Sequence, residues 1–134
     1  DEATLAAILR GRRGNLKALL LDQHRIAGIG NIYADEILHR ARLRHHRLPS
    51  RLDAPTRRRL LAAIHFVLRD AVEKGGSTLD DTQYVGIDGE PGWFQTEHRV
   101  YDRAGQRCLT CRSANIVRRV VAGRSTCFCP RCQH

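Results

Sequence analysis

The sequence lacks several features that mark large classes of protein. No apolar run approaches the roughly 20 residues that a membrane-spanning helix needs. Residues 1–13 lack the basic region and the apolar block of a secretory signal, so nothing in them points outside the cell. The sequence does not begin with methionine, and we therefore expect Asp1 to be an internal residue of a longer protein.

Internal repeats and low-complexity tracts are also missing, and the chain is short. Its 134 residues suffice for one domain, or one domain with a small appendage, and exclude a large multidomain enzyme. Hydrophobic residues make up 42% and charged residues 28%, which excludes a wholly disordered or collagen-like chain. We therefore expect one modest hydrophobic core.

Acidic residues are scarce near the C-terminus, where the positive charge is concentrated. The formal net charge of the chain is +9. Residues 98–134 carry eight arginines and a single acid, Asp102. Each cation that neutralises a phosphate releases a condensed counterion, so such a segment favours a polyanionic partner. A solvated basic face is the alternative.

All five cysteines lie in this basic segment. Two Cys-x2-Cys pairs enclose 17 residues and consist of Cys108, Cys111, Cys129 and Cys132. This spacing is typical of a four-cysteine zinc site, in which four thiolates close the coordination sphere of one structural Zn²⁺ ion. Two disulfides or a redox-active pair are alternatives, which fit poorly with the missing signs of export and of a βαβ unit. We interpret Cys127 as a packed or half-exposed thiol.

Helical patterns dominate the chain up to residue 76. Apolar residues recur at helical spacing in four segments, 2–13, 15–22, 31–41 and 53–74. Asn15 and Asp53 are the expected caps of the second and fourth helices. Gly28 and Gly30 form a turn before the third helix. The sequence therefore predicts a unit of helix, glycine turn and helix beside one longer helix.

The remaining sequence predicts a loop and then strands. Residues 77–97 contain Asp-Gly and Pro-Gly pairs, and loops of this length are often functional. Strands are expected at 100–101, 116–121 and 125–128, with a turn at 122–123. The apolar content of this tail is too small for independent folding, so we expect zinc binding to stabilise it.

The start of the helix at Asn31 is a candidate anion site. A helix N-terminus presents unpaired backbone amides and the positive end of the helix dipole, and the glycine turn keeps side chains away. The alternatives are that Asn31 is an ordinary N-cap and that Lys17 is a solvated helix cation.

Several motifs, in order along the chain, resemble the formamidopyrimidine-DNA glycosylase and endonuclease VIII family. Residues 20–23 (Leu-Leu-Asp-Gln) and 28–36 (Gly-Ile-Gly-Asn-Ile-Tyr-Ala-Asp-Glu) closely resemble its helix-two-turn-helix module. Residues 89–95 match a further family segment. The tail resembles its zinc finger through Val100-Tyr101, the four paired cysteines and Arg124-x-Thr126-x-Phe128. The resemblance covers essentially the whole chain.

The resemblance implies a mainly α fold, in which a helix-two-turn-helix bundle over residues 1–97 is followed by a small β-hairpin zinc finger over residues 98–134. Lys17 and Asn31 resemble the pair that grips phosphates around a lesion, with Gly30 leaving room beside them. Arg124 resembles the finger arginine that holds backbone beside the flipped nucleotide. The paired cysteines match the zinc ligands, and the 77–92 loop resembles the segment that closes over an everted purine.

The resemblance also implies a function in base-excision repair of oxidised purines. The chain is expected to be the damaged-DNA-binding portion of a bifunctional DNA glycosylase and abasic-site lyase. It would act on double-stranded DNA, damaged or abasic, as a monomer in the bacterial cytoplasm, associated with the nucleoid and with no membrane.

These 134 residues offer no counterpart of the family's catalytic N-terminal proline and β-sandwich, so we assign no catalytic residue and expect the chain alone to be inactive. The alternative functions are a non-catalytic damage sensor or architectural DNA binder, and a zinc ribbon that serves protein partners. Asp102 and Arg112 stand where the family usually has glycine, and the 42–49 connection is longer and more basic than expected.

Overall fold

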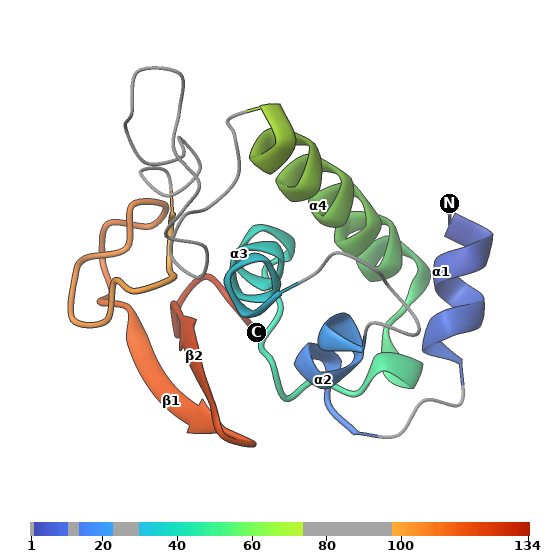
Figure 1. Ribbon diagram of the computed structural model, residues 1–134, viewed down its shortest axis with the longest axis horizontal. Helices are drawn as coiled ribbons and strands as arrows, with labels where there is room; N and C mark the ends of the chain where they lie inside the picture. The colour runs from blue at the N-terminus through green and yellow to red at the C-terminus, as the bar shows by residue number, and fades with distance from the viewer. Residues whose placement is uncertain (1, 11–13, 23–29, 74–97) are drawn as a thin grey trace.

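The computed structural model describes residues 2–10, 14–22, 30–73 and 98–134. Four helices come first, and a two-stranded antiparallel hairpin follows them (Figure 1). Their bounds are α1 (Glu2–Leu9), α2 (Leu16–Leu21), α3 (Asn31–Ala41), the 3-10 turn η1 (Pro49–Arg51), α4 (Ala54–Glu73), β1 (Val117–Val121) and β2 (Arg124–Phe128). The predicted mainly α class with a small β-hairpin is confirmed. Within the described residues, no helix combines the length and the apolar character that crossing a membrane requires.

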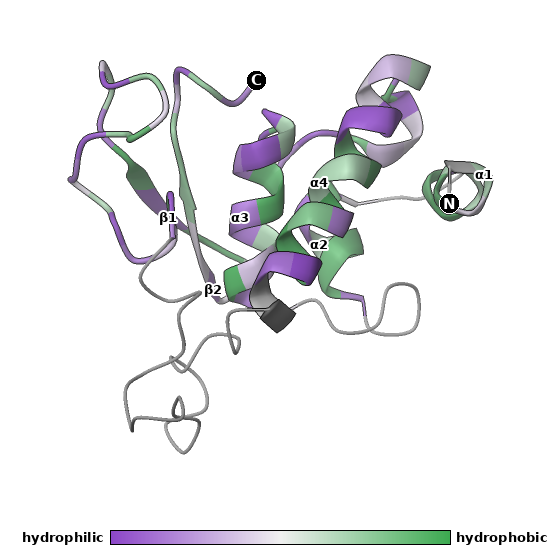
Figure 2. Ribbon diagram, turned by 90° about the horizontal axis from the view of Figure 1, so that it is seen from above, coloured by the Kyte–Doolittle hydropathy of each residue, from purple (hydrophilic) through white to green (hydrophobic). Residues whose placement is uncertain are grey.

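Helix α3 is the central element of the fold. It contacts α2, α4 and β2, and in Figure 1 it lies between the other helices and the hairpin. Hydrophobic and hydrophilic stretches alternate along α3 and α4 (Figure 2), as expected of helices with one buried face. Burying each large aliphatic side chain contributes about 1.5–3 kcal/mol. Fully buried examples are Leu16, Leu19 and Leu20 of α2, Ile37 and Leu38 of α3, and Leu60 of α4.

Local capping signals fix the starts of α2 and α4 where the sequence predicts them. The Asn15 side chain accepts a hydrogen bond from the Ala18 N–H at 2.7 Å, and the Asp53 side chain accepts one from the Thr56 N–H at 2.9 Å. The first helix is shorter than predicted, since α1 ends at Leu9; residues 11–13 lie outside the described part, as do the turn at Gly28 and the 77–97 loop.

The hairpin turn fixes the place of its first arginine. Ala122 and Gly123 both have positive φ, 51° and 78°, which is the pattern of a type I′ turn that matches the twist of paired strands. Arg124 therefore begins β2 directly after the turn, paired with Val121. The strands lie within one residue of their predicted positions.

The predicted strand at Val100-Tyr101 is wrong. The segment forms a bend and a turn, because its backbone N–H groups donate to the Glu36 carboxylate of α3, at 2.9 Å from Val100 and 2.8 Å from Tyr101. The N–H groups of Val100 and Tyr101 are therefore used in bonds to Glu36 and not in bonds to a neighbouring strand.

Two residues that depart from the family pattern occupy turns that favour glycine. Asp102 has φ 59° and Arg112 has φ 56°, both in the left-handed region. Both residues therefore adopt the left-handed conformation although they carry side chains, at a cost of roughly 1 kcal/mol per residue.

His98 gives the fold a dependence on pH. The side chain is 7% exposed, and burial lowers its pKa to about 4 from a usual value of 6.5. The unfolded chain therefore binds a proton at a higher pH than the folded chain, and stability falls as the pH drops below 6.5. We expect urea denaturation to show that the loss of stability between pH 7.5 and pH 5 is about 2 kcal/mol smaller in His98→Gln than in the original chain. An equal loss in the variant would contradict the assignment.

Candidate metal centre and nucleic-acid interface

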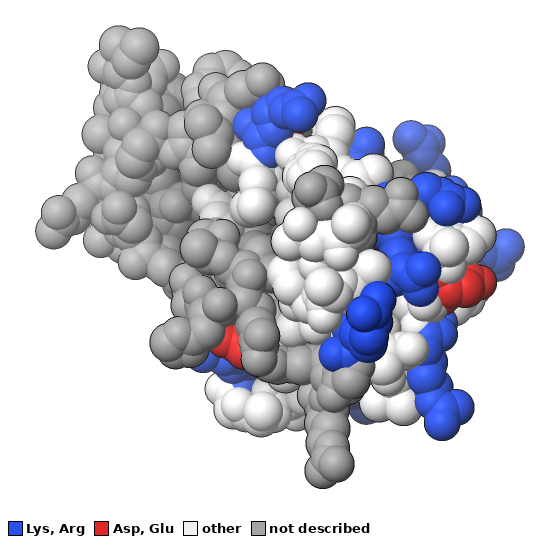
Figure 3. All heavy atoms as spheres, turned by 90° about the vertical axis from the view of Figure 1, so that its right-hand side faces the viewer, with Lys and Arg blue, Asp and Glu red and all other residues white. Residues whose placement is uncertain are grey.

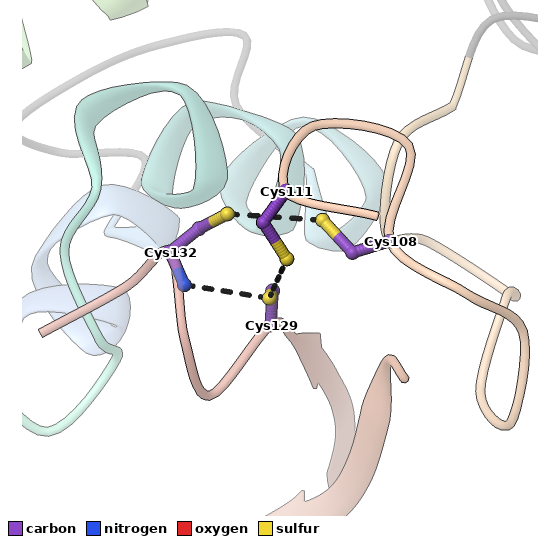
Figure 4. A group of neighbouring side chains, drawn as sticks. All are labelled: Cys108, Cys111, Cys129 and Cys132. Carbon is purple, nitrogen blue, oxygen red and sulfur yellow. Dashed lines mark hydrogen bonds between the residues drawn. The ribbon is translucent and has the colours of Figure 1, made fainter. Parts of the chain in front are cut away.

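The four predicted metal ligands meet in one place. Two turns, one after residue 107 and one after β2, direct the thiols of Cys108, Cys111, Cys129 and Cys132 toward one another (Figure 4). All four sulfur atoms lie within 4.8 Å of each other. The arrangement joins both ends of the finger at a single point.

The sulfur spacing fits a tetrahedral zinc ion. The Cys108 and Cys132 sulfurs are 3.8 Å apart, and so are those of Cys111 and Cys129. A disulfide needs about 2.05 Å, whereas a tetrahedron of thiolates about 2.3 Å from zinc has edges of about 3.8 Å. All five cysteines are free thiols, so the disulfide alternative does not describe this structure.

The electrostatics of the cluster also call for a cation. Backbone N–H groups of Ala114 and Ser113 lower the pKa of Cys111 to about 6. Burial and the neighbouring thiols raise the pKa of Cys132 to about 12. One thiolate thus forms readily near neutral pH, and its negative charge opposes ionisation of the next thiol. A metal ion therefore has to supply the positive charge that lets all four thiols ionise.

Cys127 takes no part in the cluster. It is 2% exposed, and its N–H donates to the Asp35 carboxylate of α3 at 3.0 Å. Burial raises the pKa of its thiol. It is a packed residue, as one of the two interpretations had it.

Polar side chains of α3 attach the finger to the helices. Glu36 is 5% exposed, and its carboxylate accepts three backbone N–H bonds from residues 99–101 at 2.8–2.9 Å. Burial raises the pKa of Glu36, and these donors act against the rise. A buried carboxylate with three N–H donors is a specific attachment, because an unpaired one would cost several kcal/mol.

A second attachment runs through His39 to the metal centre. The Gln133 side-chain amide donates to the Leu43 carbonyl at 2.8 Å, so its oxygen faces His39 Nδ1 at 3.2 Å and the Cys129 N–H at 2.9 Å. His39 Nδ1 must therefore donate, which leaves Nε2 to accept from the Thr110 hydroxyl at 3.0 Å. Burial lowers the pKa of His39, consistent with this neutral ring.

Lys17 is not the solvated helix cation that one alternative expected. The side chain is 3% exposed. Its ammonium lies 2.8 Å from each of three acceptors: the Asp35 carboxylate, the Ser125 carbonyl and the Thr126 hydroxyl. These three acceptors match its three donors, and two of them belong to β2, which packs against α3. Burial raises the pKa of Asp35, and Lys17 opposes this.

Asn31 is the first residue of α3 and not its N-cap. The cap is Gly30, with no side-chain hydrogen bond at this helix start. The Asn31 amide instead donates to the Ser125 carbonyl at 3.1 Å, the same oxygen that Lys17 meets. Gly30 has φ −96°, and a Cβ there would meet nothing within 4 Å, so nothing in the described part of the chain requires glycine.

The contact between Asn31 of α3 and Ser125 of β2 is called the joint below, and Arg124 lies next to it. It is exposed at the start of β2, directly before Ser125. It borders a small hollow of about 200 Å³ that Asn15, Lys17 and Val121 also line. The structure therefore brings together the four residues of the predicted backbone-binding set, with Lys17 beneath the surface and Arg124 on it.

The residues that hold this arrangement were not found from the sequence. Asp35 and Glu36 are two consecutive acids in a basic protein, and no local pattern distinguishes them from solvated residues.

Elsewhere the surface is basic: Figure 3 shows lysine and arginine side chains spread over the described part of one face, with few acidic groups between them.

Comparison with known proteins gives consistent matches. Residues 1–83 match the family model of the formamidopyrimidine-DNA glycosylase H2TH domain, and residues 105–134 that of the zinc finger found in FPG and IleRS. The chain is 57% identical to formamidopyrimidine-DNA glycosylase of Thermus thermophilus over 118 residues, 88% of this chain and 44% of that protein. Identity to the Azorhizobium caulinodans enzyme is 52%, over 96% of this chain and 46% of that protein.

Solved structures agree with these sequence matches. The crystal structure of MutM (Fpg) from Thermus thermophilus has a TM-score of 0.90 and 51% identity, covering 99% of this chain and 50% of that one. A complex of Lactococcus lactis Fpg with DNA containing an abasic site has a TM-score of 0.87 and 35% identity, covering 100% and 47%. The chain thus spans about half the length of these relatives. The matched finger and the four-cysteine cluster imply a structural zinc ion.

Proposed function

Because the chain belongs to the formamidopyrimidine-DNA glycosylase family, we propose that it binds double-stranded DNA, preferably damaged or abasic, between the start of α3 and the tip of the hairpin. In this proposal it is the DNA-binding portion of a glycosylase and abasic-site lyase that removes oxidised purines. Relatives crystallised with Fapy-dG or abasic DNA support the choice of ligand.

The observation that carries the proposal is the joint between α3 and β2. Asn31 is bonded to Ser125, and Arg124 precedes Ser125, so an uncapped helix start and an exposed guanidinium are held next to each other. Both groups bind anions well. Two such groups at fixed spacing suit neighbouring phosphates, and phosphate contacts position a protein without reading base sequence.

Within this proposal Lys17 acts as a positioning residue. Its buried ammonium bonds the strand that carries Arg124 and also the acceptor shared with Asn31. Gly30 has a different part: since none of the described residues requires glycine there, the missing side chain leaves space for a phosphodiester to reach the amides of α3.

The test is DNA binding by the zinc-loaded chain, measured by fluorescence anisotropy on duplexes with and without an abasic-site analogue. We expect tighter binding to the abasic duplex and, for about six phosphate contacts, a loss on the order of 10³ in affinity between 50 and 200 mM salt. Arg124→Ala should weaken binding to both duplexes roughly tenfold and lower the salt slope by about 1.

Arg118→Ala is the matched control, since Arg118 is an exposed arginine on the neighbouring strand. Equal effects of the two variants would mean that the finger offers a diffuse basic face and no defined backbone grip. Salt-insensitive binding would reject the nucleic-acid interface altogether.

A further inference from the structure

A groove lies at the far end of α3 from the joint with β2. It has a volume of about 820 Å³ and runs between the end of α3, the middle of α4 and the turn that carries Leu109. Asn31 begins α3, whereas the groove is lined by residues of its later turns, such as Arg40. The proposed DNA grip therefore leaves this groove open.

The groove is strongly basic. Four exposed arginines line it, from α3, α4 and the start of the finger: Arg40, Arg42, Arg59 and Arg99. Its acids are Asp70 and the buried Glu36, whose carboxylate is bonded to three backbone N–H groups. The charge complement of this surface is a ligand with several carboxylates or phosphates.

Two of these arginines are held in place before any ligand arrives. The Arg40 guanidinium lies 3.4 Å from the centre of the Phe66 ring, a cation–π contact. Arg59 Nε donates to the Ala41 carbonyl at 2.8 Å. Side chains that are already ordered lose less entropy when they bind.

Apolar side chains in the same groove separate a peptide from a nucleic-acid backbone. Phe66 is 46% exposed and Leu109 49% exposed, and both line the groove with Ala63 and Val67. A sugar-phosphate strand has no apolar side chain to cover them. An acidic peptide that also carries phenylalanine or leucine matches both the charge and the apolar surface.

We propose that this groove is a docking site for an acidic, aromatic-containing segment of a partner protein. Carboxylates of the segment pair with Arg40, Arg59 and Arg99, and an apolar side chain lies against Phe66 and Leu109. Because the groove is at the other end of α3 from the proposed DNA grip, the partner and DNA can be bound together.

The test uses the zinc-loaded chain and a short fluorescein-labelled peptide in which aspartates flank two phenylalanines. A second peptide has serine in place of both phenylalanines and the same charge. We expect the first peptide to bind roughly tenfold more tightly than the second. Arg40→Glu with Arg99→Glu, and separately Phe66→Ser, should each weaken binding of the first peptide by about tenfold or more.

Arg69→Glu is the matched control, because Arg69 is an exposed residue of α4 outside the groove. It should leave peptide binding within about twofold of the original chain. Phe66→Ser changes a half-exposed side chain, so circular dichroism and zinc content should stay unchanged and the variant should remain informative.

Three results would overturn the proposal: equal binding of the two peptides, equal effects of Arg69→Glu and the groove variants, or competition between the peptide and abasic duplex. Competition, together with loss of DNA affinity in the groove variants, would assign the groove to nucleic acid. A failure of the Arg124→Ala experiment would count against the proposed DNA interface and would not change the expected peptide binding. The two proposals can therefore fail separately.

Discussion

Replacing Cys129 with serine is expected to release the zinc ion and unfold residues 98–134, while the helical part stays folded. Cys129 is fully buried, and the core around the finger is small and built largely of cysteines. Structural zinc supplies about 10–16 kcal/mol of apparent binding energy in zinc-finger peptides, more than such a core can replace. Zinc content and hydrogen exchange should show one ion lost and protection removed from the finger alone.

Cys127→Ser is the control for this prediction. Cys127 is 2% exposed and Cys129 0% exposed, but only Cys129 belongs to the metal cluster, so the Cys127 variant should keep one zinc ion per chain. DNA affinity should fall in the Cys129 variant and persist in the Cys127 variant. Loss of zinc from both variants would show that the ligand set is wrong.

Replacing Lys17 with methionine should destabilise the chain by about 3–5 kcal/mol, because it leaves the buried Asp35 carboxylate without its counter-charge. The Ser125 carbonyl and the Thr126 hydroxyl lose the same donor. Chemical denaturation at neutral pH would measure the loss, and binding of abasic duplex should weaken as β2 loses its fixed place.

A double variant separates positioning from direct phosphate contact. Lys17→Met with Asp35→Asn removes both charges, so most of the lost stability should return. If Lys17 acts by positioning, the salt slope of DNA binding in the double variant should equal that of the original chain. A slope lower by about 1 would instead mean that Lys17 touches a phosphate.

Short-range signals in the sequence were good guides to local structure. The Cys-x2-Cys pairs indicated the metal centre, Asn15 and Asp53 the starts of two helices, and the Ala-Gly pair the hairpin turn. Each depends on residues a few positions apart. The backbone geometry that such residues favour is nearly the same in any surrounding fold.

The same reasoning failed where a distant group decided the outcome. Val100-Tyr101 has the composition of a strand, yet its N–H groups meet Glu36, 64 positions away in the case of Val100. Lys17 has the sequence context of a surface cation, yet it meets Thr126 across 109 positions. Neither contact forms until the hairpin packs against α3.

By itself, then, the sequence determined the helices, the hairpin, the metal ligands and the basic character of the tail, since these follow from spacing and charge. Only the tertiary structure decided that α3 holds the finger through the half-buried Asn31 and the buried Asp35, Glu36 and His39, and that Lys17 is buried among them. The physical reason is desolvation: a buried charge is stable only with partners, and packing alone brings those partners within reach.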